Sequence, residues 1–239
     1  MNNTANALLS IGASPVMAHA VEEVAEMSKL ASALVINIGT LSQEWVTAMA
    51  LAMTAAKQKG IPIVFDPVGA GATAYRTRIC HSLLDQTTPT VIRGNASEIM
   101  ALAGDCVQTK GVDSSAAATD AENAALALAE KYGCVVCVSG AVDLITNGNQ
   151  TTRVHNGHPL MPKVTGLGCS ATALIGAFCA ISEDVLAATS HAMTVMGICG
   201  ELAAEQAAGP GTFQVHLIDA FYNLNAEQIE THWLDPESK

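Results

Sequence analysis

Short apolar runs alternate along the chain with longer segments in which apolar and polar positions recur at a helical period. Residues 33–38 read ALVINI and residues 61–66 read IPIVFD, whereas the segment between them, 43–59, is amphipathic and is followed by Gly60. Short β-branched runs are typical of buried strands, and glycine commonly ends a helix. The three segments therefore predict one βαβ unit, whose two strands lie parallel in the same sheet.

The same alternation continues through most of the chain. Residues 105–116 are small and polar and predict a loop, and Pro210 has to separate the last two helices. The pattern predicts an α/β fold with a central, mostly parallel sheet, helices on both faces and an antiparallel hairpin at residues 143–155. The further predicted helices are 74–84, 95–103, 119–132, 169–181, 183–207 and 213–223, and the further predicted strands are 90–92, 134–139, 143–146 and 152–155.

Composition and charge narrow the class of protein. Half of the 239 residues are apolar, which is enough for a sizeable core in a single domain spanning 1–239. A formal net charge of −11 would repel nucleic acid and anionic membranes, so we expect neither as a partner. The N-terminus has no basic residue, and Gly12 and Pro15 interrupt its apolar stretch, which fits neither a signal peptide nor a membrane span. We therefore expect a cytoplasmic protein whose seven cysteines are reduced thiols.

One predicted strand ends in a carboxylate. Asp66 closes the strand 61–66 and is followed by Gly69 and Gly71, which allow a backbone to approach a ligand closely. In an open α/β sheet, ligands bind beyond the carboxyl ends of the strands. Asp66 is therefore a candidate site residue, although an Asp before Pro67 also simply starts a turn.

A second candidate follows the strand 90–92. Here Arg93 is placed to reach a phosphate, and Glu98 to help hold Mg²⁺ through water. Asn95 and Glu98 also have the spacing of a capping box, in which both side chains only cap backbone N–H groups. The residues alone leave both interpretations open.

A third candidate is the glycine-rich turn 164–170, VTGLGCS, at the start of an apolar helix. Backbone N–H groups at a helix start bind anions such as phosphate, and the same field lowers the pKa of a thiol. Cys169 is thus the cysteine predicted to be reactive, although it also suits a small core position. The chain has no Walker sequence.

Other chemistry-bearing residues have plainer interpretations. Cys134 and Cys137 have the spacing of a redox motif, but inside a strand their thiols would point to opposite faces. His155 and His158 lack nearby acidic or cysteine ligands and predict a loop rather than a metal site. His19 is predicted to be structural.

Six motifs in this order resemble the successive signatures of the hydroxyethylthiazole kinase family, and together they span nearly the whole chain. They are Gly12-Ala13-Ser14-Pro15-Val16-Met17, Asn37-Ile38-Gly39-Thr40-Leu41, Asp66-Pro67-Val68-Gly69-Ala70-Gly71, Arg93-Gly94-Asn95-Ala96-Ser97-Glu98-Ile99, Asn156-Gly157-His158-Pro159-Leu160-Met161 and Gly166-Leu167-Gly168-Cys169.

The resemblance implies a ribokinase-like fold and a Mg²⁺-assisted transfer of the ATP γ-phosphoryl group. The acceptor would be the primary alcohol of 4-methyl-5-(2-hydroxyethyl)thiazole, in thiamine biosynthesis or salvage. The family also looks trimeric, with active sites between subunits, so the substrate loop would complete a neighbour's pocket. The residues that the resemblance implies are Met17 and Gly166 for the thiazole, Arg93 and Ser139 for ATP, Asp66 and Glu98 for Mg²⁺, Gly166, Leu167, Gly168 and Cys169 for the transferred phosphoryl group, and Cys169 for the attacking hydroxyl.

The chain departs from the family pattern at three points. Family members usually begin some two dozen residues earlier, Leu167 replaces a more usual Thr, and Ser139 stands where Thr is common. One alternative is another ribokinase-like enzyme, such as a hydroxymethylpyrimidine or pyridoxal kinase or a repair dehydratase, although Cys169 stands where those have Asp. Another is a catalytically silent nucleotide-binding protein that lacks the family's N-terminal segment.

Overall fold

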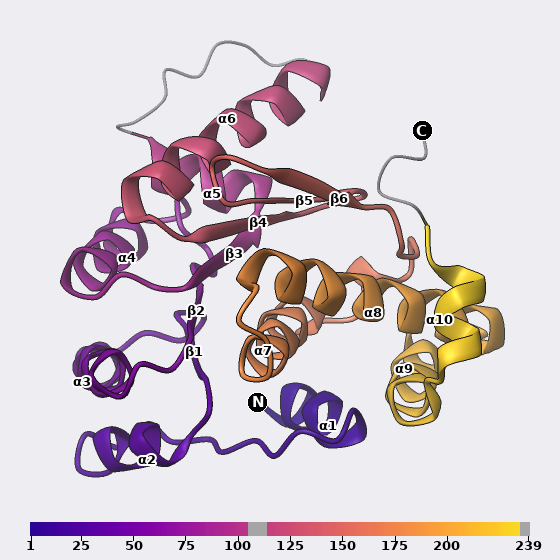
Figure 1. The fold of residues 1–239 in the computed structure, drawn as a ribbon, viewed down its shortest axis with the longest axis horizontal. Helices are drawn as coiled ribbons and strands as arrows, with labels where there is room; N and C mark the ends of the chain where they lie inside the picture. Colours follow the sequence, from indigo (N-terminus) through magenta and orange to yellow (C-terminus); the bar gives the residue numbers. More distant parts are fainter. Residues whose placement is uncertain (105–113, 235–239) are drawn as a thin grey trace.

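The computed structural model describes residues 1–104 and 114–234. Helices and strands alternate through the first two thirds of these residues, and helices alone form the last part (Figure 1). In chain order the elements are α1 (Asn2–Ser10), α2 (Val24–Leu30), β1 (Leu34–Asn37), α3 (Gln43–Lys59), β2 (Ile63–Asp66), α4 (Ala74–Gln86), β3 (Val91–Asn95), α5 (Ala96–Ala103), α6 (Ser114–Tyr132), β4 (Val135–Ser139), β5 (Asp143–Thr146), β6 (Thr151–Val154), the 3₁₀ turn η1 (Met161–Lys163), α7 (Leu167–Cys179), α8 (Val185–Gln206), α9 (Pro210–Asn223) and α10 (Ala226–His232).

The strands form one six-stranded sheet in the order β1-β2-β3-β4-β5-β6. β1 to β4 are parallel, and β5 and β6 add an antiparallel hairpin at one edge. Alternate strand residues serve two separate cores: Ile63 and Phe65 of β2 pack toward α3 and α4, whereas Val64 packs toward α7. Helices therefore cover both faces, as the pattern of apolar residues predicts (Figure 1).

Local signals account for the best-predicted helix. α3 begins after Ser42, whose hydroxyl accepts a hydrogen bond from the N–H of Trp45 at 3.3 Å. It ends at Gly60, which has a left-handed φ of 80° that favours glycine. The predicted bounds 43–59 are confirmed.

Other elements differ from the predictions in their bounds, or were not predicted. β3 extends to Asn95, beyond the predicted strand 90–92, because Arg93, Gly94 and Asn95 pair with β4. α6 begins at Ser114, so the end of the predicted loop 105–116 is helical, and its other residues lie outside the described ones. The short helix α10 was not predicted, although Asn225 and Gln228 form a capping box at its start.

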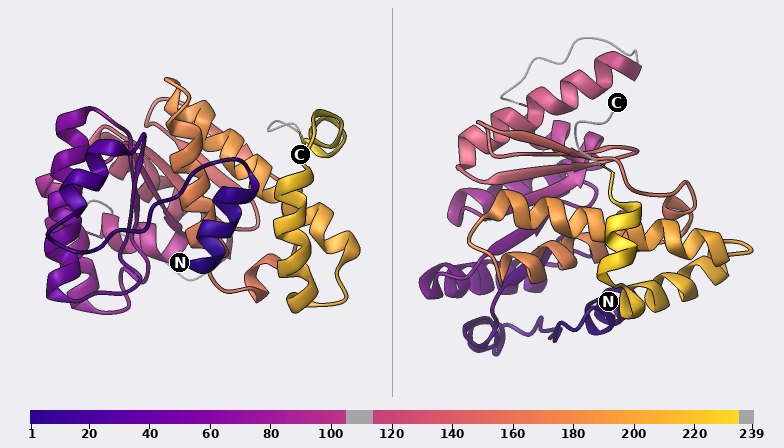
Figure 2. Two further views of the ribbon diagram at one scale, coloured as in Figure 1. Left: turned by 90° about the horizontal axis from the view of Figure 1, so that it is seen from below. Right: turned by 45° about the vertical axis from the view of Figure 1, so that its right-hand side comes forward.

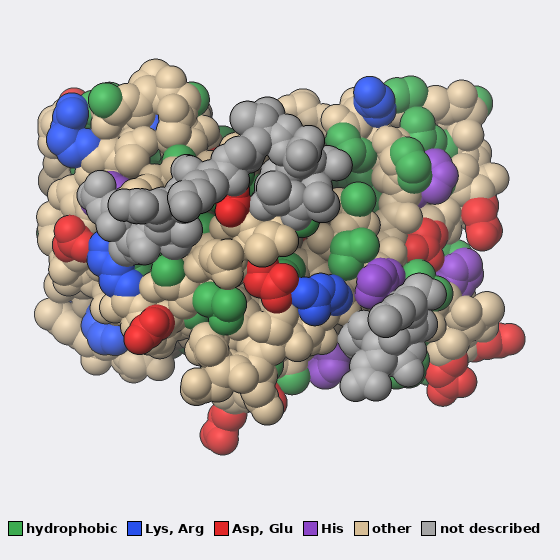
Figure 3. Space-filling model, turned by 90° about the horizontal axis from the view of Figure 1, so that it is seen from above, with side chains coloured by type: hydrophobic (Ala, Val, Ile, Leu, Met, Phe, Trp, Pro, Cys, Tyr) green, Lys and Arg blue, Asp and Glu red, His purple; other side chains and the backbone are tan. Residues whose placement is uncertain are grey.

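The apolar helices α7 and α8 fill one of the two cores. By length and composition alone α8 could cross a membrane, but 56% of its apolar window is buried inside the fold, as in the core helix of a globular protein. α1 packs beside α7 and α9, where Asn3 accepts a hydrogen bond from Gln214 at 2.8 Å (Figure 2). On the face shown in Figure 3, the visible Lys and Arg side chains are scattered rather than gathered into a stripe.

Candidate active site

Polar residues close four neighbouring parallel strands at the same edge of the sheet. Asn37 ends β1 and pairs in register with Asp66, which ends β2. Asn95 ends β3 and pairs in register with Ser139, which ends β4. The carboxyl ends of parallel strands are where α/β folds bind ligands, so this edge is the candidate active site.

Asp66 is the most deeply buried acid of this edge, with 1% of its surface exposed. Its Oδ2 accepts hydrogen bonds from the Asn37 amide at 3.0 Å and from the Thr172 hydroxyl of α7 at 2.8 Å. Burial raises the pKa of Asp66 from 3.8 to about 6, against the opposing effect of the Arg93 charge. The buried carboxylate thus lacks enough compensating positive charge.

Glu98 connects two segments of the edge. Its Oε1 accepts from the N–H of Gly69 at 2.8 Å, and its Oε2 accepts from the N–H of Asn95 at 2.9 Å. Asn95 in turn accepts from the N–H of Glu98 at 3.0 Å, so the capping box is present. Glu98 is therefore a helix cap and also a brace between the turn after β2 and the start of α5.

Arg93 lies between β4 and the start of α7. It donates a hydrogen bond to the hydroxyl of Ser139, and its Nη1 lies 2.7 Å from where a Cβ on Gly168 would stand. Among the described residues, the Arg93 Nε is the buried side-chain atom without a hydrogen-bond partner. Since buried donors are nearly always paired, this atom points to a missing acceptor.

The glycine-rich turn places α7 against this guanidinium. Gly166 precedes the helix with a φ of 84°, and no side chain caps the first turn. The first backbone hydrogen bond of α7 runs from the N–H of Ser170 to the carbonyl of Gly166, at 3.0 Å. The N–H groups that precede Ser170 are therefore left for an anion. Leu167 sends its side chain into the core, with 8% of its surface exposed, and contributes its backbone to the turn.

The prediction of a lowered thiol pKa at Cys169 is wrong. The pKa of Cys169 is raised, first by burial and then by the charge of Asp66, whereas a hydrogen bond from Asn37 and the charge of Arg93 only partly oppose these effects. The Asn37 amide donates to Sγ at 3.2 Å. At neutral pH Cys169 is therefore a thiol rather than a thiolate, because desolvation outweighs the field of the helix start.

The structure brings together Asp66, Arg93, Glu98, Ser139 and the turn, but not Met17. Met17 lies between α1 and α2, has 44% of its surface exposed and belongs to neither described core.

Sequence reasoning gave no role to two residues of this edge. Asn37 was part of a signature motif, and its position at the end of a strand beside that of Asp66 is the signal that could have identified it. Thr172 has 0% of its surface exposed and lies within an apolar helix, where no local pattern marks it.

The contacts of His19, Cys134, Cys137 and His158 agree with their plainer interpretations. His19 stacks on Trp45 with ring centroids 4.9 Å apart, and Cys134 and Cys137 face opposite cores. His158 accepts a hydrogen bond from the N–H of Leu160 within its own loop. The described cysteines are all unpaired, while Cys106 lies outside the described residues.

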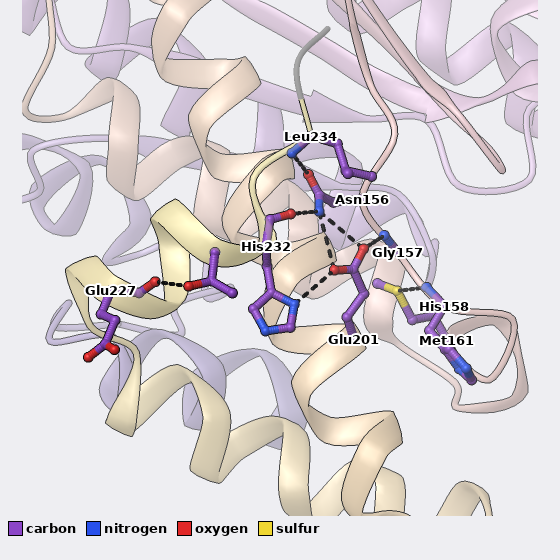
Figure 4. Close-up of polar contacts among 9 residues, drawn as sticks. Asn156, Gly157, His158, Met161, Glu201, Glu227, His232 and Leu234 are labelled. Atoms are coloured by element: carbon purple, nitrogen blue, oxygen red, sulfur yellow. Dashed lines mark hydrogen bonds and ion pairs between the residues drawn. The ribbon is translucent and has the colours of Figure 1, made fainter. Parts of the chain in front are cut away.

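The signature residue Asn156 lies in a cluster with Glu201 of α8 and His232 of α10 (Figure 4). Its amide donates to Glu201 Oε1 at 3.1 Å and to the carbonyl of His232 at 2.7 Å. The motif thereby connects the loop after β6 to the end of the described chain.

Comparisons with known proteins agree with the geometry. A family model described as "Hydroxyethylthiazole kinase family" matches residues 1–227. The hydroxyethylthiazole kinase of Syntrophus aciditrophicus is 55% identical over 230 residues, which cover 96% of this chain and 85% of the relative. That of Oleidesulfovibrio alaskensis is 53% identical, with 96% and 86% covered.

Solved structures show the same fold. The hydroxyethylthiazole kinase protein of Pyrococcus horikoshii has a TM-score of 0.90 at 45% identity, with 98% of this chain and 88% of that one covered. A ribokinase-like superfamily protein from Enterococcus faecalis has a TM-score of 0.66 at 14% identity, with 92% and 80% covered, which shows the fold alone. The predicted ribokinase-like α/β fold is confirmed, and the chain belongs to the hydroxyethylthiazole kinase family.

Proposed function

We propose that the edge formed by β1 to β4 and the start of α7 is where this hydroxyethylthiazole kinase performs its reaction. The reaction moves the γ-phosphoryl group of ATP to the primary alcohol of 4-methyl-5-(2-hydroxyethyl)thiazole, in thiamine biosynthesis. The observation that carries the proposal is the Arg93 guanidinium, which has an unpaired buried Nε and lies against an uncapped helix start. A cation and free N–H groups at one place suit a phosphate chain.

Arg93 and Ser139 are the proposed ATP contacts. Ser139 orients Arg93 by accepting its hydrogen bond, which leaves the rest of the guanidinium for phosphate oxygens. The N–H groups of Leu167, Gly168 and Cys169 form the proposed cradle for the transferred phosphoryl group. Phosphoryl transfer depends mainly on positioning and charge stabilisation, which this arrangement supplies.

Asp66 and Glu98 are the proposed residues for Mg²⁺. The raised pKa of Asp66 fits a carboxylate that gains a cation, and no described donor contacts its Oδ1. Each Glu98 oxygen already accepts one N–H, which favours contact through water. The described residues contain no group of three or more potential metal ligands, as expected where substrate phosphates supply the others. When bound, Mg²⁺ neutralises charge on the phosphate oxygens.

Cys169 and Gly166 are the proposed neighbours of the thiazole alcohol. Because burial keeps Cys169 protonated, we assign it the holding of the hydroxyl rather than the removal of its proton before transfer. The loose transition state of phosphoryl transfer makes early deprotonation unnecessary.

Met17 is the proposed thiazole contact supplied by a neighbouring subunit of a homotrimer. The exposure of Val16 and Met17, 62% and 44%, supports an interface there. We further propose that the chain forms a single domain, which the one continuous sheet supports, and that it works in the cytoplasm.

The test is ADP release from purified protein with Mg-ATP, with and without the thiazole. We expect thiazole-dependent release, and we expect Arg93→Met to lower kcat/KM by about 10²-fold or more, as loss of a transition-state contact does. Arg153→Met is the matched control, because Arg153 is half exposed and pairs with Glu122 on the surface. ATP binding without thiazole-dependent release from the parent protein would favour the catalytically silent alternative, and equal losses in both variants would contradict the role of Arg93.

A further inference from the structure

Arg76 makes a set of contacts that the assigned site does not use. It lies in the first turn of α4, where its N–H donates to the Thr73 cap at 3.2 Å. Its Nη1 donates to the carbonyls of Ile38 at 2.9 Å and Val68 at 2.8 Å, and its Nη2 donates to the carbonyl of Gly39 at 3.0 Å. One guanidinium thus connects the segment after β1 with the segment after β2.

These two segments carry the polar residues of the candidate site. Gly39 donates its N–H to Oδ1 of Asn37 at 2.8 Å, which fixes the amide so that its NH₂ group faces Asp66 and Cys169. On the other segment, Gly69 donates its N–H to Glu98 at 2.8 Å. The carbonyls that Arg76 binds therefore lie within one or two residues of the groups that orient Asn37 and Glu98.

The stem of Arg76 also fits the backbone beside it. Gly69 has a φ of 75°, and a Cβ built there would meet Cδ of Arg76 at 3.2 Å. A Cβ built at Gly39 would lie 3.7 Å from the side chain of Val68, so the two segments also pack on each other. The stem of Arg76 therefore packs closely against Gly69, and Val68 packs against Gly39.

Among the described residues, no salt bridge joins Arg76 to a carboxylate. Its charge acts on three backbone carbonyls instead. The planar guanidinium offers five N–H donors in a fixed geometry, whereas a lysine ammonium offers three donors from a single nitrogen. Three carbonyls spread over two segments therefore suit arginine better than lysine.

We propose that Arg76 is a positioning residue for phosphoryl transfer, which holds the segments 38–39 and 68–69 in the arrangement that keeps Asn37, Asp66 and Glu98 at their working distances. This inference rests on the proposed function of the same edge. Arg76 acts through the backbone and touches no reacting group. Its loss displaces the site residues without removing any of them.

The matched pair of variants is Arg76→Met and Arg78→Met. Arg78 lies on the same helix, is exposed and stacks over Tyr75 at 5.7 Å. We expect Arg76→Met to lower kcat by about 10²-fold, as small misplacements of reacting groups do, with the KM for ATP unchanged. Arg78→Met keeps the activity of the parent protein.

Two further readouts separate positioning from general stability. Guanidinium ion added to the Arg76→Ala variant should restore part of its kcat. The Arg76→Lys variant should keep a low kcat. In the ligand-free protein, amide hydrogen exchange in Arg76→Met becomes faster over residues 37–41 and 66–72 and stays unchanged in α8.

The proposal is overturned if exchange over these two segments stays unchanged, or if it rises equally through the whole chain without guanidinium rescue. Failure of the proposed function looks different, because the parent protein itself then shows no thiazole-dependent ADP release. In that case the exchange experiment, which needs no substrate, still decides whether Arg76 holds the two segments.

Discussion

Two polar clusters of this protein are built from similar parts but are completed differently. Each contains a carboxylate that accepts from an asparagine amide: Asp66 with Asn37 at the edge of the sheet, and Glu201 with Asn156 between α8 and the loop after β6 (Figure 4). Both oxygens of Glu201 have donors, including the N–H of Gly157 at 2.7 Å, and His232 lies 3.6 Å away as an ion-pair partner.

The cluster at Asp66 is unfinished by comparison. Both of its described donors bind the same oxygen, and burial raises its pKa to about 6. Nearby, the Nε of Arg93 has no acceptor among the residues that the structure describes. A buried network in which both the carboxylate and the guanidinium have atoms without hydrogen-bond partners is arranged for a ligand. A network whose polar atoms are all paired stabilises the fold instead.

The largest expected effect is on catalysis. Asp66→Asn should lower kcat by roughly 10²–10³-fold, because the amide keeps the hydrogen-bond acceptor but removes the charge proposed for Mg²⁺. ADP release at several Mg²⁺ concentrations measures this effect. Asp184→Asn, which alters the surface cap of α8, is the control that should keep its activity.

The same variant should be more stable than the parent protein when metal and nucleotide are absent. Because the folded pKa of about 6 is above the ordinary 3.8, the folded protein binds this proton more tightly, and the ionised form destabilises it above about pH 6. The gain from Asp66→Asn, on the order of 1–3 kcal/mol, should be complete above that pH and vanish as pH falls toward 3.8. Urea unfolding at several pH values tests this, and a gain independent of pH would contradict it.

A smaller effect is expected at Cys169. Cys169→Ala should lower kcat by less than about 10²-fold, because a protonated thiol orients the hydroxyl without acting as a strong base. Steady-state rates from pH 6 to 9 measure it. A larger loss, together with a rate in the parent protein that follows a thiol titration, would restore Cys169 as the general base.

The smallest effects are expected at the completed cluster, and they concern stability alone. Glu201→Gln should lower the free energy of unfolding by about 1–3 kcal/mol, because an NH₂ group would face donors that need an acceptor. His232→Ala should lower it by less than about 1 kcal/mol, since the ion pair is partly exposed. Urea unfolding compares the two, and a loss of kcat in either folded variant would break the distinction between the clusters.

Much of the fold follows from local sequence signals. The short, continuous apolar runs of β2 and β4 predicted buried strands, and Gly60 predicted the end of α3, whose Ser42 cap the structure added. The capping box at Asn95 and Glu98 was also predictable from spacing. These features depend on residues that are close in sequence, and their dihedral preferences and backbone hydrogen bonds are set locally.

The site could be predicted only in part. The sequence indicated Asp66, Arg93, Glu98 and the glycine-rich turn as candidates, because each ends a strand or begins a helix. It did not indicate that Asn37 joins Asp66 to Cys169 across 132 positions. The family resemblance named several site residues but gave Asn37, Arg76 and Thr172 no role.

Tertiary structure alone decided the charge states and contacts at this edge. A helix start by itself lowers a thiol pKa, but packing around Cys169 and the nearby Asp66 reverses the direction. Arg76 likewise finds its three carbonyls only once β1 and β2 lie side by side. Burial and long-range contacts determine these properties, because the cost of a buried charge depends on every group packed around it, whatever its distance along the chain.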